Sequence, residues 1–398
     1  MDPIATGRST VRYVDIGSVD GSTHRLTDIP EIDSATAPSR CRQVLMAGDT
    51  VFSTVRPYLQ KIAFIDRSLD QQFASTGFCV LRPSPDLDQR FLFHFAVSRG
   101  LLDQVLPKQK GVSYPAVLDR EVRQCVLPVP PLAEQRRIVA ILEEHLTSLD
   151  HARVQLATAE RRLASLLQAS MKANVGDGDQ GWESSTVGSR AVLVEYGSSA
   201  KTSPESVDGI PVLRMGNIQN AALDWRSLKY LPRSHADFPR LLLRRGDLLF
   251  NRTNSAELVG KSAVVDTPDD ASFASYLIRV RFDPSVLPEW ANMVINSLQG
   301  RSYISSVVSQ QVGQANVNGT KLKAFPLPVP PLDEQRRRVL EHGLVAETVR
   351  RTSDSLIRIK DRGEAVRRSL LAAAFSGRLT GRSSDSGLIE DLADQEAL

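Results

Sequence analysis

The chain contains two copies of one domain-sized pattern. The segment LPVPPLAEQRR at residues 127–137 returns as LPVPPLDEQRR at residues 327–337, so each residue has a partner 200 positions later. Solenoid repeats have much shorter periods, of about 20 to 50 residues. A period this long therefore indicates a duplicated domain with pseudo-twofold character and not a stacked array.

Weaker matches extend the repeat through both halves. They pair Phe73-Ala-Ser75 with Phe273-Ala-Ser275, Gly48-Asp49 with Gly246-Asp247, and residues 15–19 with residues 214–218. These matches lie ahead of the proline-rich segment in each half and keep the same order. Each half therefore contains a whole globular domain.

A heptad pattern follows each proline-rich segment. Leucines or valines recur seven apart on one seam, with further apolar residues beside them: Leu142, Leu149, Leu156 and Leu163 with Ala152, Ala159 and Leu166, and then Val349, Leu356 and Leu370 with Val345, Ile359, Val366 and Ala373. This pattern predicts two coiled-coil helices, the first about 60 Å long at 1.5 Å per residue. Because each helix needs a partner to cover its apolar stripe, we expect the two to pack together, antiparallel.

The ends of these helices are marked by proline and glycine. Val-Pro-Pro stands before each helix, where the residue before a proline avoids the helical region and the second proline suits the first turn. The turn-rich linker at residues 174–181 ends the first helix, and Ser376-Gly377 ends the second. Gly363 interrupts the second seam, which indicates a close approach of the helices or a local weakness of about 1 kcal/mol relative to Ala.

The two globular parts, residues 11–129 and 182–328, have mixed patterns. Short β-rich pieces are expected at 51–65, 259–265 and 275–282, and apolar helical stretches at 90–105 and 288–308. The predicted fold class is α+β, with two similar domains joined and separated by two long antiparallel helices. The boundaries are 1–129 for the first domain, 130–175 for its helix, 176–328 for the second domain, 329–381 for its helix, and 382–398 for a disordered tail.

The composition places few constraints on function. With 41% hydrophobic and 24% charged residues among 398, the chain is globular, and a net charge of +3 permits DNA binding without requiring it. Since no apolar run reaches the length of a membrane span, we expect a cytoplasmic protein. Cys41, Cys79 and Cys125 lie far apart, with neither zinc-ligand nor disulfide spacing.

Two apparent enzyme motifs fail on close reading. Val129-Pro-Pro-Leu132 has the prolines of an adenine methyltransferase loop but neither its amide nor its aromatic residue. The stretch from Ser255 to Ser262 resembles a phosphate-binding loop, but its first position is serine where glycine is required. The histidines have no metal-ligand spacing, and no Ser/His/Asp order suggests a hydrolase. We therefore expect no catalytic residue and no metal site.

Polar loops at matching places in the two halves are the candidates for DNA contact. The segment at residues 310–319 is rich in amides, which can bond adenine bidentately, and the lysines of its counterpart at 108–114 suit phosphate. Further polar residues follow the two Gly-Asp turns. The candidates are Arg56, Tyr58, Lys108, Lys110, Ser113, Tyr114, Asn251, Arg252, Asn254, Gln310, Gln311, Gln314, Asn316 and Asn318. Each could instead be a solvated loop residue.

The paired PPL(A/D)EQRR segments, each opening a heptad helix, and the segment LLAAAFSGRL at residues 370–379 resemble the repeated regions of type I restriction-modification specificity subunits (HsdS). In that family two target-recognition domains each read one half of a split sequence in double-stranded DNA, while the helices space them and dock two methylation subunits. The resemblance covers almost the whole chain. It implies a non-catalytic subunit, with restriction subunits as further partners.

The resemblance also implies where partners and cofactors belong. The residues opening the helices become candidates for partner binding: Leu132, Glu134, Gln135, Leu332, Glu334 and Gln335. S-adenosylmethionine, ATP and magnesium are expected on the partner subunits, with no cofactor in this chain. A coiled-coil scaffold without DNA readout is the alternative, but it leaves the duplicated domains with their diverged amide-rich loops unexplained.

One departure concerns the front of the first domain. The second half has 30 residues from Trp182 to Pro211 before the strand that precedes Gly216, whereas the first half has 12 before Tyr13. Either the true start lies upstream or the first domain is truncated at its front. The competence of the first domain as a reader depends on which holds.

Overall fold

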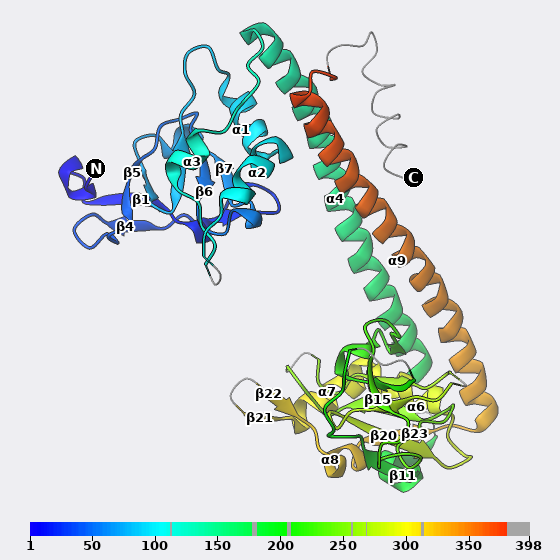
Figure 1. Cartoon of the computed structure of the whole chain (residues 1–398). Helices are drawn as coiled ribbons and strands as arrows, with labels where there is room; N and C mark the ends of the chain where they lie inside the picture. Colours follow the sequence, from blue (N-terminus) through cyan, green and yellow to red (C-terminus); the bar gives the residue numbers. More distant parts are fainter. Residues whose placement is uncertain are drawn as a thin grey trace. The chain divides into compact units, whose positions relative to one another are not determined.

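The computed structural model describes residues 1–111, 114–176, 181–204, 208–255, 258–267, 269–311 and 314–379 (Figure 1). The chain divides into two compact units. Unit 1 consists of Met1–Ala157 with Leu356–Leu398, and unit 2 of Thr158–Ser355. Both boundaries fall inside the long helices, so each unit contains one globular part and a portion of both helices.

The two long helices have equal lengths and equivalent positions in the repeat. Helix α4 spans Leu132–Val175 and helix α9 spans Leu332–Phe375, 44 residues each. Both begin directly after the second proline of the repeated segment, two residues after the predicted start for α4 and three after it for α9, because the X-Pro step holds the preceding chain extended. At 1.5 Å per residue each is roughly 66 Å long.

Within each unit the helical segments pack antiparallel, which confirms the prediction. In unit 1, Leu142 and Leu146 near the start of α4 share an apolar cluster with Leu370 near the end of α9. In unit 2, the hydroxyl of Ser170 lies 3.0 Å from Nδ1 of His342, at the opposite ends of the two helices. Figure 1 shows these segments side by side.

The predicted seam is correct in its main positions and wrong at its margin. Leu142, Val349, Leu370 and Ala373 are buried, and Leu149, Leu156 and Leu163 are half-buried. Three residues assigned to the neighbouring seam are exposed: Leu166 at 49%, Ile359 at 54%, and Ala152. The heptad alone does not separate the residues that face the partner helix from those at the edge of the stripe.

The globular part of unit 1 holds two small sheets and a hairpin. The first sheet has the order β4-β1-β8-β5 and the second the order β7-β6-β9, while β2 pairs with β3. The strands are β1 (Thr10–Val14), β2 (Val19–Asp20), β3 (Arg25–Leu26), β4 (Glu31–Asp33), β5 (Cys41–Val44), β6 (Thr50–Ser53), β7 (Ile62–Phe64), β8 (Phe73–Ser75) and β9 (Phe78–Leu81). The helices are α1 (Gln89–Val97), α2 (Arg99–Val105) and α3 (Asp119–Arg123), with short 3-10 turns at Pro3–Thr6, Ile16–Ser18, Pro57–Leu59, Arg67–Leu69 and Leu106–Lys108.

Unit 2 repeats this plan with additional strands. Its sheets have the orders β11-β20-β16-β18, β15-β12-β19, β17-β22-β21, β13-β14 and β10-β23. The strands are β10 (Glu183–Thr186), β11 (Ala191–Tyr196), β12 (Gly209–Leu213), β13 (Ile218–Gln219), β14 (Ala222–Leu223), β15 (Lys229–Pro232), β16 (Leu248–Asn251), β17 (Thr253–Asn254), β18 (Ser262–Val264), β19 (Ser272–Phe273), β20 (Leu277–Phe282), β21 (Ser309–Gln311), β22 (Gln314–Asn316) and β23 (Pro326–Val329). The helices are α5 (Val187–Arg190), α6 (Pro288–Asn296), α7 (Leu298–Val307) and α8 (Gly319–Lys323), with a 3-10 turn at Met215–Asn217.

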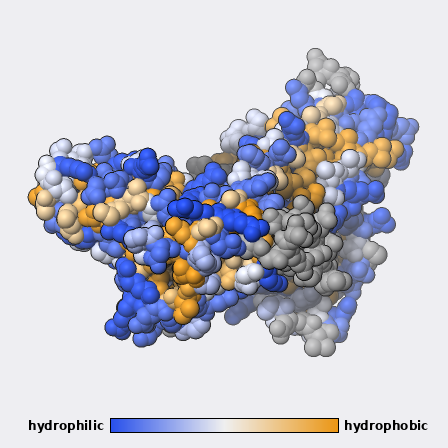
Figure 2. All heavy atoms as spheres, turned by 90° about the horizontal axis from the view of Figure 1, so that it is seen from above, coloured by the Kyte–Doolittle hydropathy of each residue, from blue (hydrophilic) through white to orange (hydrophobic). Residues whose placement is uncertain are grey.

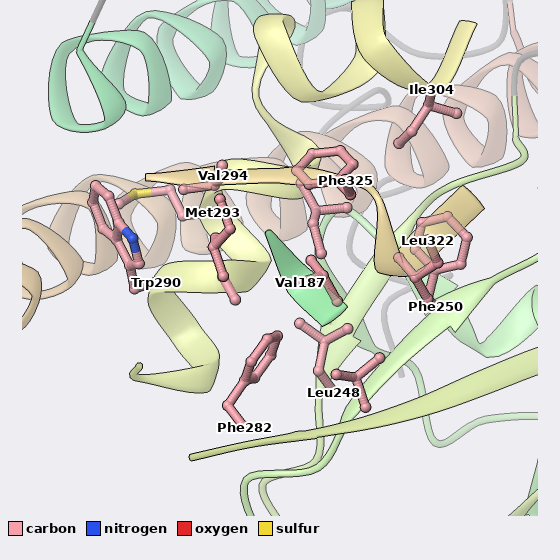
Figure 3. Packing of buried hydrophobic residues seen from close by; sticks show 14 of the residues in the cluster. Val187, Leu248, Phe250, Phe282, Trp290, Met293, Val294, Ile304, Leu322 and Phe325 are labelled. Atoms are coloured by element: carbon pink, nitrogen blue, oxygen red, sulfur yellow. The ribbon is translucent and has the colours of Figure 1, made fainter. Parts of the chain in front are cut away.

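The core of unit 2 lies between the four-stranded sheet and helices α6 and α7. Leu248, Phe250 and Phe282 from the sheet belong to one buried cluster with Trp290 and Met293 of α6 (Figure 3). The indole N–H of Trp290 donates to the carbonyl of Pro328, 2.9 Å away, which ties α6 to the proline-rich segment that opens α9. The predicted α+β class is confirmed in both units.

The two Gly-Asp turns hold equivalent ion pairs, each between a buried aspartate and a partly exposed arginine. Asp49 accepts hydrogen bonds from Nε and a terminal nitrogen of Arg82, both at 2.8 Å, and Asp247 accepts the same pair from Arg281 at 2.8 and 3.0 Å. Both carboxylates are buried. Gly48 and Gly246 have φ of 95° and 88°, a region that glycine reaches without strain. This turn fixes the start of β6 and of β16.

One sequence match was misaligned by a residue. Phe73 pairs with Tyr13 in unit 1, whereas Phe273 pairs with Leu213 in unit 2, the counterpart of Val14. The identical Phe-Ala-Ser tripeptides are therefore not equivalent, because side chains alternate between the two faces of a strand.

The leading segment of the second domain forms β10, α5 and β11. Strand β11 pairs with the outer edge of β20. In the described part of unit 1 no strand pairs with β9 at the corresponding edge, where Arg123 donates to the carbonyl of Val80 at 2.9 Å. The described residues of unit 1 thus contain no counterpart of this segment, as the sequence comparison indicated.

Candidate nucleic-acid interface

The candidate DNA-contact segments of unit 2 meet in one small sheet. Strands β21 and β22 pair antiparallel as a hairpin. Strand β17 pairs with the other edge of β22, where Thr253 lies opposite Asn316. The segment after the second Gly-Asp turn and the amide-rich segment, separate in sequence, are therefore neighbours. This three-stranded sheet is called the recognition sheet below.

Unit 1 brings its counterparts together in the same way. Val55 and Lys110 both form β-bridges with Ala116. The amide of Val117 donates to the carbonyl of Thr54 at 2.9 Å, just as the amide of Val317 donates to the carbonyl of Arg252 at 2.9 Å. The equivalent backbone hydrogen bond joins the two candidate segments of unit 2 directly, and in unit 1 it joins the residues next to them.

An arginine stacks on a tyrosine beside each of these junctions. The guanidinium of Arg56 lies 4.7 Å from the ring centre of Tyr114, and that of Arg252 lies 4.9 Å from the ring centre of Tyr196. Tyr196 was not among the candidates from sequence. It belongs to β11, which has no repeat partner to point to it, so the comparison of the halves gave no signal.

Positive charge accompanies the recognition sheet of unit 2. The amide of Asn251 donates to the carbonyl of Lys261, which places Lys261 beside the end of β16. Burial lowers the pKa of Lys261, and the nearby charge of Arg301 on α7 lowers it further. Two cations held close together in a partly buried place favour the approach of an anion such as phosphate.

The remaining candidates of unit 1 are distributed between surface and interior. Tyr58 and Tyr114 are exposed, as is Lys110. Lys108 is half-buried, and its ammonium group donates to the carbonyl of Glu121 at 3.3 Å. Ser113 lies outside the described residues.

Some amide candidates of unit 2 have a role inside the protein. Asn251 is buried, and its amide nitrogen donates to the carbonyl of Leu258 at 3.3 Å, so its side chain is not presented at the surface. Asn318 is exposed but accepts from the amide of Lys321 at 2.9 Å as the N-cap of α8. Asn316 is half-buried in β22. The side chains of Asn254, Gln310, Gln311 and Gln314 lie outside the described structure.

The partner-binding candidates at the helix starts fall into two groups. Gln135 and Gln335 are fully buried and hydrogen-bonded within their own units, so neither side chain faces a partner. Glu334 pairs with Arg337 and Arg338, whose hydrogen bonds lower its pKa to about 2. Leu132, Glu134 and Leu332 are half-buried, and partner contact by them stays a prediction.

The described residues contain neither a metal-binding cluster nor a membrane-spanning helix. Among the described residues, no three His, Cys, Asp or Glu side chains are grouped to hold a metal ion. None of the described helices combines the length and apolarity that crossing a bilayer requires. The face shown in Figure 2 is largely hydrophilic, with apolar residues gathered in patches between the polar ones.

Comparisons with known proteins agree on one family. Residues 13–158 match the model of the type I restriction modification DNA specificity domain. The type I restriction enzyme EcoKI specificity subunit of Escherichia coli K12 is 26% identical over 351 residues, which is 81% of this chain and 75% of that protein. The StySPI specificity subunit of Salmonella potsdam is 25% identical over 353 residues, with the same two shares.

Solved structures extend the likeness to the whole fold. A chain from a structure titled as the basis of complex assembly and conformational transition of the type I R-M system has a TM-score of 0.76 and 28% identity, over 95% of this chain and 94% of that chain. The HsdS subunit of Thermoanaerobacter tengcongensis has a TM-score of 0.53 and 28% identity, over 95% and 93%.

Proposed function

We propose, because the chain belongs to the type I restriction-modification DNA specificity subunits, that each of its units reads one half of a two-part DNA target. Sequence-specific DNA recognition is the function of this family's specificity domain. One observation carries the two-part assignment: equivalent backbone hydrogen bonds, from Val117 to Thr54 and from Val317 to Arg252, hold the chain together at or next to the candidate segments in both units. Two equivalent reading surfaces imply two half-sites.

The chain would determine which DNA sequence is bound, and its partner subunits would carry out the reactions. Two methylation subunits would dock on it, flip the target adenines out of the duplex and methylate them from S-adenosylmethionine. Restriction subunits, using ATP and magnesium, would cleave DNA that lacks the methyl groups. Such a complex, with a non-catalytic specificity subunit, would act on the DNA of its own cell and hence in the cytoplasm.

The test is a map of methylated adenines in the native host, with and without this gene. A two-part motif that disappears with the gene supports the proposal. Native mass spectrometry of the chain with its methylation subunit should give two methylation subunits per chain, and the chain alone should neither methylate nor cut DNA.

Other outcomes would contradict parts of this proposal. Methyl transfer by the chain alone would overturn the non-catalytic assignment. A one-part motif, or a complex with one methylation subunit, would mean that unit 1 is not a second reader. The alternative of a scaffold without DNA readout predicts no salt-dependent DNA binding by the complex, whereas neutralised phosphates make binding fall steeply with salt.

A further inference from the structure

Each unit presents an arginine whose guanidinium lies over the ring of a tyrosine. Arg252 follows β16 directly and stacks on Tyr196, and Arg56 lies three residues beyond β6 and stacks on Tyr114. Both arginines lie shortly after the end of the strand that follows the Gly-Asp turn, among the candidate DNA-contact residues. Stacking restrains the guanidinium plane and leaves its in-plane N–H groups directed away from the ring.

Tyr196 is held from two sides. Its backbone belongs to β11, where it pairs with Ile278 of β20. Its hydroxyl accepts a hydrogen bond from the amide of Gly319 at 2.8 Å, at the start of α8 just beyond the hairpin β21-β22. Tyr196 therefore connects Arg252 with the four-stranded sheet β11-β20-β16-β18 and with the start of α8, which follows the hairpin.

Polar atoms without partners lie beside this stack. Nε of Arg252 and Oδ1 of Asn316 are buried, and neither has a hydrogen-bond partner among the described residues. Arg252 lies between β16 and β17, and Asn316 of β22 pairs with Thr253, the residue after Arg252. Buried polar atoms are nearly always hydrogen-bonded in folded proteins, so an unpaired guanidinium nitrogen at Arg252 indicates a polar ligand there.

We propose that Arg252 reads a guanine in the half-site of unit 2 and that Tyr196 is the residue that positions it. Guanine presents two acceptors, O6 and N7, on its major-groove edge, and the planar fork of arginine matches them with two parallel hydrogen bonds. A phosphate contact needs only the charge and tolerates a mobile side chain, whereas a base contact needs the fixed orientation that the stack provides. The inference rests on the proposed function.

Arg56 and Tyr114 form the arginine–tyrosine pair of unit 1, although the shared backbone hydrogen bond makes Thr54, and not Arg56, the positional counterpart of Arg252. Tyr114 lies in the reading segment itself and is 71% exposed, whereas Tyr196 comes from a central-sheet strand and is 42% exposed. Arg56 has a φ of 48°, and its amide donates to the carbonyl of Pro115 at 2.7 Å. The backbone therefore contributes more to the orientation of Arg56, and the tyrosine less.

The test compares methylation motifs of variants in complex with the methylation subunits of the same system. The substrate is a DNA library randomised across the two half-sites found for the wild type. For Arg252→Lys, which keeps the charge but loses the fork, the preference for guanine at one position of one half-site should fall by between about 5-fold and 150-fold. The other half-site should keep its preferences and thereby shows that the variant is folded.

Two variants of Tyr196 separate its ring from its hydroxyl. Tyr196→Leu removes the stack and should weaken the preference at the same guanine, while Tyr196→Phe keeps the ring and should retain most of it. Tyr114→Leu should affect the other half-site, and to a smaller degree than Tyr196→Leu affects its own.

Three outcomes would overturn the inference. The first is a wild-type motif in which the half-site relaxed by Arg252→Lys contains no G·C pair. The second is an equal loss of methylation for all library sequences, which is the behaviour of a phosphate contact. The third is an Arg252→Lys motif identical to that of the wild type. If the wild-type complex itself had no defined motif, the proposed function would fail instead, so the two failures are distinguishable.

Discussion

Gln135 and Gln335, 200 positions apart, make the same three hydrogen bonds, each within its own unit. The side-chain oxygen of Gln135 accepts from the amide of Asp88, and its nitrogen donates to the carbonyls of Asp86 and Pro130, at 2.7, 3.0 and 2.8 Å. Gln335 does the same with Leu287, Ser285 and Pro330, each at 2.8 Å. The glutamine of the PPL(A/D)EQRR segment therefore joins the start of each long helix to its globular part.

Replacing either glutamine by leucine should destabilise its own unit. The leucine keeps the volume but leaves an amide and two carbonyls facing an apolar side chain, and each buried unpaired group costs about 1–3 kcal/mol. We expect the free energy of unfolding, measured by urea denaturation, to fall by at least about 2 kcal/mol. Arg336→Ala is the control, since its ion pair with Asp333 is exposed and should be worth less than about 1 kcal/mol. Equal effects of the two substitutions would contradict the assignment.

Glu143 should make unit 1 sensitive to acid. His94 and Arg90, whose nitrogens lie 3.6 and 2.6 Å from its Oε1, lower its pKa from an ordinary 4.5 to about 2. Since the pKa is lowered by folding, the stabilisation is complete above pH 4.5 and is lost as the pH falls through 2. The side chain is 39% exposed, so solvent screening reduces the contribution to about 1 kcal/mol.

The matched variant for this prediction is Glu143→Gln, which has no charge to titrate. Near pH 7 the wild type should be the more stable protein by thermal unfolding, and the difference should shrink steadily between pH 4.5 and pH 2. A difference in stability that stays constant across this pH range would show that Glu143 stabilises unit 1 through packing and not through its charge.

Exchange of residues 182–328 for the equivalent segment of another specificity subunit should change one half-site and leave the other unchanged. The reason is that the reading segments of this half contact one another within unit 2, in the recognition sheet. Methylation mapping of the chimaera measures both half-sites at once. Loss of both specificities in a folded chimaera would count against independent readers.

Lengthening both helices by one heptad, after Leu156 and after Leu356, should widen the gap between half-sites. These points lie next to the places where α4 and α9 pass from one unit to the other. Seven residues add about 10 Å, which corresponds to roughly three base pairs of about 3.4 Å. The half-sites should not change, but affinity should fall because the added pairs also turn the duplex by about 100°.

A four-residue insertion at the same points is the control for phase, because it breaks the heptad and should be tolerated less well. If a folded, active heptad-insertion variant methylated sites with the original gap, the helices would not set the spacing, and the methylation subunits would have to do so.

The long helices were predictable because their signals are local and repeated. Two prolines, a heptad and an absence of glycine determine where α4 begins, and its start at Leu132 was predicted within two residues. The expected β-rich pieces and helical stretches also contain elements such as β6, β20 and α6. These signals depend on periodicity, which a sequence displays directly.

The details of the site depend on tertiary contacts that leave no local trace. Strands β21 and β22 of the amide-rich region pair with each other although Gln and Asn are poor strand formers, since β17 pairs with β22 on its other edge. Gln135 and Asn251 look like surface residues in sequence but are buried, and their amide nitrogens donate to backbone carbonyls of residues that the sequence does not mark as neighbours. Tyr196 belongs to β11, which has no repeat partner among the described residues of unit 1, so comparing the two halves of the sequence did not identify it.

Unit 2 is built from one uninterrupted stretch of chain, Thr158–Ser355, whereas unit 1 is assembled from two stretches. A single genetic exchange that replaces this stretch therefore transfers a complete unit together with its share of both helices. The break points fall within α4 and α9, where any incoming sequence of the same heptad phase can continue the seam. On the proposed function, a lineage would thereby acquire a new half-site in one recombination event, and the residues of the other unit would be left unchanged.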